Sequence, residues 1–420
     1  MKRQINLAAR ETFRSLRHRN FRLFFAGQFV SQTGTWLTMI ATTLLVYDLT
    51  KSATAVGILT ACQFGPVLLL SAWSGLVADR RDKRKLLMIA QVGAMAKSFA
   101  LAGFAFLDHP PSAALYAISV VGGVATAFDN PARRSYVVEM VPEADVQNAV
   151  SINSALMTSS RIFGPAFAGL LIATVGYGWT FMIDGLSYLA VLYGLWLIDP
   201  SKIRTGPVAP RGRGQIRAGF RYLRQVPVLW TSMVIMAIVG TLTFNFQVVF
   251  PDFVHRTLGG DTTDFALLFS VTSVGSLVGA LATARRTTVE LRDVIVSAAL
   301  YGAAMAVLGL APNLLAAYVV ALFVGFTSIA FLTTATAIVQ LRADPVMRGR
   351  VLALQSMVFI GSTPIGGPIL GAICDAFGAR AGIAIGAAGA LGAAWLGMVM
   401  GRRITDEPPV QGDIGLVAAG

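Results

Sequence analysis

Long apolar stretches, broken by short polar turns, make up most of this chain. Each stretch has roughly 20 residues or more, the length that a helix needs to cross a lipid bilayer. The twelve stretches lie approximately at residues 23–47, 54–78, 86–107, 113–132, 147–175, 178–198, 227–250, 264–284, 293–311, 314–341, 349–375 and 379–401. None alternates between apolar and polar at every second residue, as the strands of a membrane barrel would. The pattern predicts an all-α membrane protein with twelve transmembrane helices.

The composition agrees with this prediction. Of the 420 residues, 55% are hydrophobic and 13% are charged, whereas soluble proteins carry about 25% charged residues. The 42 glycines suit closely packed membrane helices, because small side chains let helix backbones approach one another. The two cysteines, Cys62 and Cys374, have no metal-binding spacing, and we interpret them as small core residues.

The polar turns differ strongly in charge. The net charge is +13, and about 29 of the 34 Lys and Arg residues fall in the termini, in residues 200–225 and in alternate turns. The remaining turns contain Lys51, Arg256 and Arg380. Because cytoplasmic loops of membrane proteins are enriched in Lys and Arg, this distribution predicts that both termini are cytoplasmic. The basic charge is therefore an orientation signal, and no nucleic-acid partner is expected.

The predicted helices divide six and six around a segment rich in Pro, Gly and Arg. The predicted regions are a cytoplasmic N-terminal arm (1–22), an N-terminal six-helix bundle (23–199), a cytoplasmic linker (200–226), a C-terminal six-helix bundle (227–401) and a cytoplasmic tail (402–420). A short amphipathic helix is predicted within the linker, at Ile216–Leu223. The linker thus separates two units of similar size.

The two units also repeat a motif. Asn148–Gly169 and Gly349–Gly371 each begin at the predicted cytoplasmic side and reach a Gly-Pro pair about 16 to 18 residues later. Gly-Pro pairs are common in membrane helices, but position, surroundings and offset agree here. The repeat predicts two pseudo-symmetric bundles with a binding site between them.

A charged turn, GLVADRRDKRK at Gly75–Lys85, joins the second and third predicted helices. It resembles the signature loop of the major facilitator superfamily, except that Asp82 replaces the usual glycine; the matching residues are Gly75, Asp79, Arg80, Lys83 and Arg84. RIFGPAFAG in the fifth helix is similar to the exporter-associated motif of that superfamily, through Gly164, Pro165, Ala168 and Gly169. Residues 130–142 and 348–351 resemble the branch that contains the enterobactin exporter, macrolide efflux proteins and transmembrane secretion effectors.

The resemblance implies a major facilitator fold and a gate that opens alternately on the two sides. Asp79 is expected to contact the start of the eleventh helix, near Arg348 and Arg350, where the helix dipole favours an anion. Arg80 or Arg84 is expected to pair with Asp129. Bending is expected at Gly-Pro pairs in alternate helices, including Gly164-Pro165 near Gly169 and Gly367-Pro368. The alternative is a solvated charged turn that only fixes the topology.

Polar and aromatic residues on four predicted helices define a candidate substrate site. These residues are Gln28, Gln32, Trp36, Thr126, Asn245, Gln247, Phe331 and Thr334. Polar groups that face lipid are costly, so they are expected to point inward. Amides, hydroxyls and aromatic rings with little formal charge suit an amphiphilic organic molecule. For any one residue, a polar contact between helices explains the pattern equally well.

Proton coupling needs an ionisable group at membrane depth. The candidates are Asp184 in the sixth helix, Asp48 at the outer end of the first and Arg161 in the fifth. The arginine found deep in the fourth helix of many proton-driven drug exporters is absent, so their coupling scheme is not implied.

The sequence therefore predicts a proton-coupled exporter of amphiphilic small molecules, such as drugs or siderophores, acting as a monomer in the bacterial cytoplasmic membrane. The alternatives are a facilitated or proton-independent transporter and a membrane sensor or assembly factor that transports nothing. No enzyme is expected, since the chain has no P-loop and only three histidines, all outside the apolar stretches. No metal or cofactor is predicted.

Overall fold

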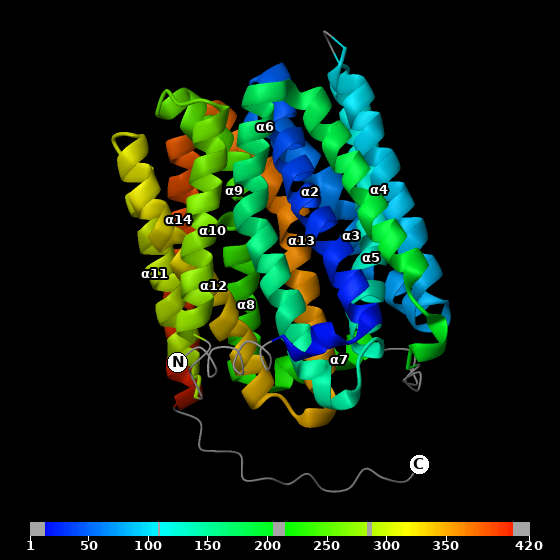
Figure 1. Cartoon of the computed structure of the whole chain (residues 1–420). Helices are drawn as coiled ribbons and strands as arrows, with labels where there is room; N and C mark the ends of the chain where they lie inside the picture. The colour runs from blue at the N-terminus through cyan, green and yellow to red at the C-terminus, as the bar shows by residue number, and fades with distance from the viewer. Residues whose placement is uncertain (1–12, 108–109, 205–214, 284–287, 406–420) are drawn as a thin grey trace, which may run out of the picture.

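The computed structural model describes residues 13–107, 110–204, 215–283 and 288–405, all built from helices and turns. The described helices are η1 (Arg14–Arg17), α2 (Arg19–Thr50), α3 (Ala53–Arg80), α4 (Lys83–Ala105), α5 (Ser112–Glu139), η2 (Glu143–Asp145), α6 (Val146–Leu197), η3 (Pro200–Lys202), α7 (Gln215–Gln225), α8 (Pro227–Leu242), α9 (Phe246–Asp252), a π-helical turn η4 (Phe253–Thr257), α10 (Thr262–Thr283), α11 (Leu291–Gly309), α12 (Leu314–Arg342), α13 (Pro345–Phe377) and α14 (Ala379–Thr405). The long helices stand side by side in one bundle (Figure 1). Residues 1–12 of the predicted arm, 205–214 of the linker and 406–420 of the tail fall outside the described residues, and so does the side chain of Asp79, whereas the amphipathic helix predicted in the linker lies within α7.

Eleven of the described helical segments are long and apolar enough to cross a membrane. One of them, α6, has a non-helical backbone at Gly176, with φ of 79°, a conformation that favours glycine. The chain reverses there, because Asn148 near the start of α6 contacts Ser15, while Asp199 just beyond its end contacts Asn20. Counted on either side of Gly176, α6 crosses twice, and the predicted all-α fold with twelve crossings is confirmed (Figure 1).

The seventh crossing differs from the prediction. Residues 227–250 were expected to form one helix, but the chain leaves helical geometry between α8 and α9, where Asn245 has φ of −105° and ψ of 45°. The fourth crossing, α5, is longer than predicted and continues to Glu139. Arg133, assigned to a turn from the sequence, therefore lies inside α5 and is buried.

Polar residues at the predicted turns start several helices. Ser52 caps α3 by accepting from the backbone N–H of Ala55, and Asn313 does the same for α12 through Ala316. Asp82 accepts from the backbone N–H groups of Arg84 and Lys85 at the start of α4. Such caps satisfy amides that have no partner inside the helix. They fix where each crossing begins.

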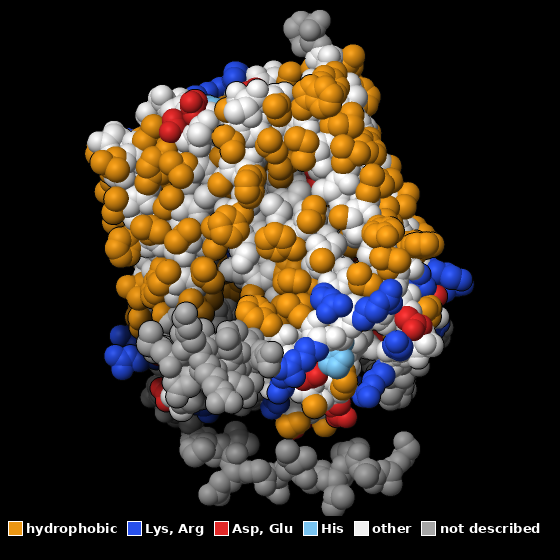
Figure 2. All heavy atoms as spheres, in the orientation of Figure 1, with side chains coloured by type: hydrophobic (Ala, Val, Ile, Leu, Met, Phe, Trp, Pro, Cys, Tyr) orange, Lys and Arg blue, Asp and Glu red, His pale blue; other side chains and the backbone are white. Residues whose placement is uncertain are grey.

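The two ends of the bundle are distinct in Figure 1. We define the lower end as the one with Arg19 and Lys83, where α2 and α4 begin, and the upper end as the one with Thr50 and Gly176. A broad band of apolar side chains lies between charged residues near the two ends (Figure 2). Large apolar side chains point outward within it; for example, Ile89 is 70% exposed and Phe323 is 62% exposed. Such a surface is suited to the hydrocarbon core of a bilayer.

Close backbone contacts join the first six crossings to the last six. A Cβ atom added to Gly57 of α3 would overlap the backbone of Gly367 and Pro368 of α13, and one added to Gly371 would overlap Ala53. Lower in the same helix pair, a Cβ at Gly361 would overlap Leu68. Glycine therefore permits α3 and α13 to pack backbone against backbone at the boundary between the halves.

Candidate functional site

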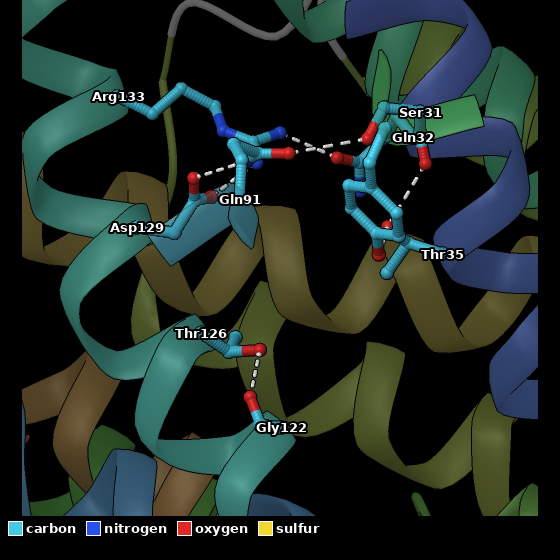
Figure 3. Close-up of polar contacts among 9 residues, drawn as sticks. Ser31, Gln32, Thr35, Gln91, Gly122, Thr126, Asp129 and Arg133 are labelled. Carbon is cyan, nitrogen blue, oxygen red and sulfur yellow. Dashed lines mark hydrogen bonds and ion pairs between the residues drawn. The ribbon is translucent and has the colours of Figure 1, made fainter. Parts of the chain in front are cut away.

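A buried ion pair lies within the N-terminal half, between Asp129 and Arg133 of α5 (Figure 3). Gln91 of α4 donates to the other Asp129 oxygen at 2.7 Å, and Arg133 also donates to Gln32 of α2 at 2.5 Å. Gln91 in turn accepts from Ser31 Oγ at 3.4 Å. Three helices are thus joined by charge-assisted hydrogen bonds, which are stronger than neutral ones.

A small cavity of about 70 Å³ adjoins this network. Its walls come from α2, α4, α5 and α6 and include Lys97, Thr126 and Tyr188. The hydroxyl of Thr126 donates within its own helix, to the carbonyl of Gly122 at 2.9 Å (Figure 3). The cavity has room for water and several polar partners to hold it.

Asp184 lies close to this cavity and is completely buried in α6. Its carboxylate accepts hydrogen bonds from Thr38 at 2.5 Å, from Ser98 at 2.6 Å and from Ser187 at 3.4 Å. Lys97, which lines the cavity, interacts with it electrostatically. Three hydroxyl donors and a nearby ammonium group stabilise the ionised form of a buried carboxylate.

The charged turn makes contacts within the N-terminal half. Lys83 forms an ion pair with Glu139 at the end of α5. Arg84 donates to the carbonyls of Leu195 and Trp196, each at 2.7 Å, at the end of α6. The predicted pairing of Arg80 or Arg84 with Asp129 is not present in this structure, where Arg80 is exposed and Asp129 pairs with Arg133 of the same helix.

The remaining lower-end candidates are spread out. Gly75 is partly buried in α3. On α13, Arg350 donates to the sulfur of Met347 at 3.2 Å, and Arg348 has a buried Nε that lacks a hydrogen-bond partner. The predicted contact of Asp79 with this helix start concerns a side chain outside the described residues.

Polar contacts between the halves gather at the upper end. Tyr47 of α2 donates to Asp252 of α9 at 2.9 Å, and its ring stacks on His255 with centroids 5.4 Å apart. Arg256 donates to the carbonyl of Lys51. These contacts hold α2 against the seventh crossing and close this end. Among the described residues, the hydrogen bonds that Asp48 accepts come from its own half, from Tyr177 and Lys51.

Near mid-height, Arg161 of α6 lies over the ring of Trp36, with 5.8 Å from the guanidinium carbon to the ring centroid. A Cβ on Gly164 would overlap the Cβ of Trp36, so this glycine makes room for the indole. Trp36 also packs against Phe269 of α10, at 6.2 Å between centroids. Further up, Gly169 abuts Ala266 of α10. The exporter-like motif thus lies where the halves meet, and Pro165 within it is buried.

The other predicted substrate residues are mostly buried. Gln28 is buried, and neither its amide oxygen nor its nitrogen has a hydrogen-bond partner among the described residues. Asn245 donates to Thr241, whereas its oxygen is unpaired. Gln247 reaches across the halves to the sulfur of Met39 at 2.9 Å. Phe331 and Thr334 lie in the core of the C-terminal half. The structure therefore brings Trp36 and Arg161 together, whereas Gln32, one turn earlier on α2, accepts from Arg133.

Several residues of these networks were not found from the sequence. Arg133 and Gln91 were missed because α5 was predicted too short and because glutamine in a membrane helix gives no specific signal. Asp252 and Tyr47 were missed because both lie near the ends of their apolar stretches. For Asp252, its position directly after Pro251, just beyond the stretch at 227–250, was the available signal.

Comparisons with known proteins agree with the helical arrangement. The model of a family described as transmembrane secretion effector matches residues 10–410. The chain is 24% identical to the staphyloferrin A transporter of Staphylococcus aureus (strain NCTC 8325 / PS 47), over 84% of this chain and 89% of that protein. It is 25% identical to the multidrug efflux pump Tap of Mycolicibacterium fortuitum, over 83% and 87%, and 22% identical to the enterobactin exporter EntS of Escherichia coli O1:K1 / APEC, over 85% of each.

Solved structures share the fold at low identity. A bacterial homologue of the human lysosomal transporter Spinster, inward-facing and occupied, superposes with a TM-score of 0.72 at 16% identity, over 93% of this chain and 97% of that one. The nucleoside transporter NupG gives a TM-score of 0.71 at 14% identity, over 91% and 99%. The predicted resemblance and the prediction that the chain is not an enzyme are confirmed. Since the family model spans nearly the whole chain, the protein belongs to the transmembrane secretion effector family of major facilitator transporters.

Proposed function

We propose that this transporter exports amphiphilic small molecules, such as drugs or siderophores, from a bacterial cell in exchange for protons. In this proposal residues 23–199 and 227–401 are the two bundles that move, and one chain acts alone. The lower end faces the cytoplasm, as the distribution of Lys and Arg predicts. The direction of transport is supported by relatives described as an efflux pump and as a siderophore exporter.

The observation that carries proton coupling is the burial of Asp184 beside Lys97. An ionised carboxylate at membrane depth is costly unless a cation or several donors hold it. Asp184 accepts from three hydroxyl groups and feels the charge of Lys97, and the neighbouring cavity gives water a place next to Lys97. We assign Asp184 as the proton carrier, which binds a proton when Lys97 moves away from it and releases the proton when Lys97 comes closer.

The contacts at the two ends support the proposed gate. The upper end is held closed by Tyr47, Asp252 and their neighbours, so the structure corresponds in this proposal to a state closed toward the outside. When the lower end closes, Asp79 and the charged turn meet the start of α13. The glycines and prolines of α6 and α13 then serve as the packing surfaces on which the bundles rock.

Everted membrane vesicles test the proposal. An imposed proton gradient is followed with acridine orange while amphiphilic antibiotics and siderophores are added in turn. Antiport predicts that at least one compound dissipates the gradient in vesicles with this protein and that an uncoupler stops accumulation of that compound. Asp184→Asn should abolish the response, whereas Asp199→Asn, at an exposed site beyond α6, should retain it.

Two results would contradict parts of this proposal. Movement of the compound across the vesicle membrane that only equilibrates its concentration, and that proceeds equally after the gradient is collapsed, would favour a facilitated transporter. Gradient-driven efflux that survives Asp184→Asn would exclude Asp184 as the carrier and leave Asp48 as the candidate to test next.

A further inference from the structure

Arg161 is a cation at the boundary between the halves, and no described acidic residue forms an ion pair with it. It lies on α6 one turn before Gly164, on the stretch that faces α2 of its own half and α10 of the other. In the parts of the chain that the structure describes, no hydrogen bond or ion pair reaches its guanidinium group, and its Nε is buried without a partner. An arginine carries its charge at any physiological pH, so this charge lacks a partner.

The contacts that Arg161 does make are with aromatic side chains. It lies over Trp36, within the distance at which a cation is attracted to the face of an indole ring. Tyr301 of α11, on the opposite half, interacts with it electrostatically, but the phenol uses its hydrogen on the carbonyl of Thr243 at 3.2 Å. Neither neighbour supplies a negative charge.

Further aromatic rings lie next to these residues in both halves of the protein. Trp36 packs on Phe269, and Tyr301 packs on Phe244 with centroids 5.1 Å apart. Phe244 also meets Phe359 edge-on at 5.1 Å. These rings offer flat apolar surfaces next to one fixed positive charge. A ligand that satisfies both features has an aromatic or apolar body and an anionic group attached to it.

We propose that Arg161 binds the carboxylate of an amphiphilic substrate whose apolar body packs against Trp36 and Phe269. The planar guanidinium group donates two parallel hydrogen bonds to a carboxylate, which a lysine cannot reproduce. The inference names a substrate class for the proposed exporter and so rests on transport of amphiphilic molecules. It is independent of proton coupling, because Arg161 keeps its charge throughout the cycle.

Gly164 contributes to this subsite by position. Any side chain there would push Trp36 away from α6, and with it the ring over which the guanidinium group lies. The subsite therefore combines a cation, the ring that orients it and the glycine that admits the ring.

Binding of matched acid and amide pairs to the purified full-length protein tests the proposal. The probes are dansylglycine and dansylglycinamide, together with naphthylacetic acid and its amide, titrated by ligand or tryptophan fluorescence. The wild type should bind the acids about tenfold more tightly than the amides. In Arg161→Gln this preference should disappear, and in Arg161→Lys it should be reduced. Arg292→Gln, which removes an exposed arginine at the start of α11, should keep the full preference.

Circular dichroism and size-exclusion chromatography show whether each variant is folded, and Arg161→Lys provides a second variant if Arg161→Gln fails to fold. An acid preference that persists unchanged in both Arg161 variants would overturn the proposal, and so would a wild type that binds neither member of any pair or binds both equally. Because the assay uses detergent without a gradient, failure of proton exchange alone leaves the acid preference intact and would be recognised separately in vesicles.

Discussion

The carboxylate of Asp375, in the last turn of α13, accepts a hydrogen bond from Ser52 Oγ at 2.5 Å. It also accepts from the backbone N–H groups of Ala53 at 2.8 Å and Thr54 at 3.0 Å, which open α3. These amides have no partner inside α3, and the helix dipole favours an anion at that point. Asp375 thus links the C-terminal half to the N-terminal half at the upper end.

Replacing Asp375 by Asn should weaken this link and increase the population of states open at the upper end. Loss of the charge at a helix start costs about 1 kcal/mol, which corresponds to about a fivefold change in population. Double electron–electron resonance between spin labels at Ala113 and Leu310, in a background without Cys62 and Cys374, measures the shift. Asp48→Asn is the matched control, because its partners Tyr177 and Lys51 lie in its own half. Equal distance distributions for all three proteins would contradict the gating role.

The contact of Asp375 also shows what could be predicted. From the sequence we expected an anion at the end of one helix to meet the start of another, with Asp79 of α3 meeting α13 at the lower end. The structure has the reciprocal contact at the upper end, where Asp375 of α13 meets α3. The attraction of an anion to a helix start and the pairing of α3 with α13 were both predictable from the sequence. Which of the two ends is closed depends on the relative free energies of two arrangements of the whole bundles. No local sequence pattern indicates this difference.

The crossings were predictable because each needs about 20 apolar residues. The side-chain contacts between these helices were harder to predict. Asp129 had two candidate arginines in the charged turn, but Arg133, one helical turn along α5, is closer in space and needs no contact between helices. The gap between two apolar stretches predicted the reversal at Gly176. The break near Asn245 lies inside an apolar stretch, so the hydrophobic pattern did not predict it.

Gly164→Ala and Gly65→Ala form a matched pair, because each glycine precedes a proline in a membrane helix. A Cβ at Gly164 would overlap Trp36, while a Cβ at Gly65 would meet nothing within 4 Å. We expect Gly164→Ala to destabilise the protein by about 1–3 kcal/mol and to impair transport, since overpacking displaces side chains. Gly65→Ala should have nearly the stability and the transport rate of the wild type. Thermal unfolding in detergent and transport in vesicles measure the two effects; equal behaviour of the variants would mean that flexibility at Gly-Pro, rather than room for Trp36, matters.

Double-mutant cycles distinguish the two possible partners of Asp129. The observed pair predicts a coupling free energy of about 1–3 kcal/mol between Asp129→Asn and Arg133→Met, because both groups are buried and hydrogen-bonded. Between Asp129→Asn and Arg84→Met the coupling should be within about 0.5 kcal/mol of zero, since Arg84 binds carbonyls at the end of α6. The free energies of unfolding come from denaturation in mixed micelles. A large coupling with Arg84 would restore the pairing expected from the sequence.

Lys97 and Asp184 should depend on one another in the same way, but with a consequence for transport as well. Lys97→Met leaves a buried carboxylate with hydroxyl donors but without the nearby cation, which should lower the free energy of unfolding by about 1–3 kcal/mol. Adding Asp184→Asn removes the charge that was left unpaired, so the double variant should be more stable than Lys97→Met alone. Proton-driven efflux should nevertheless be lost in both, because the double variant restores packing without restoring a group that binds protons. If the double variant recovered gradient-driven transport together with its stability, the pair would be a structural contact and the proton carrier would have to lie elsewhere.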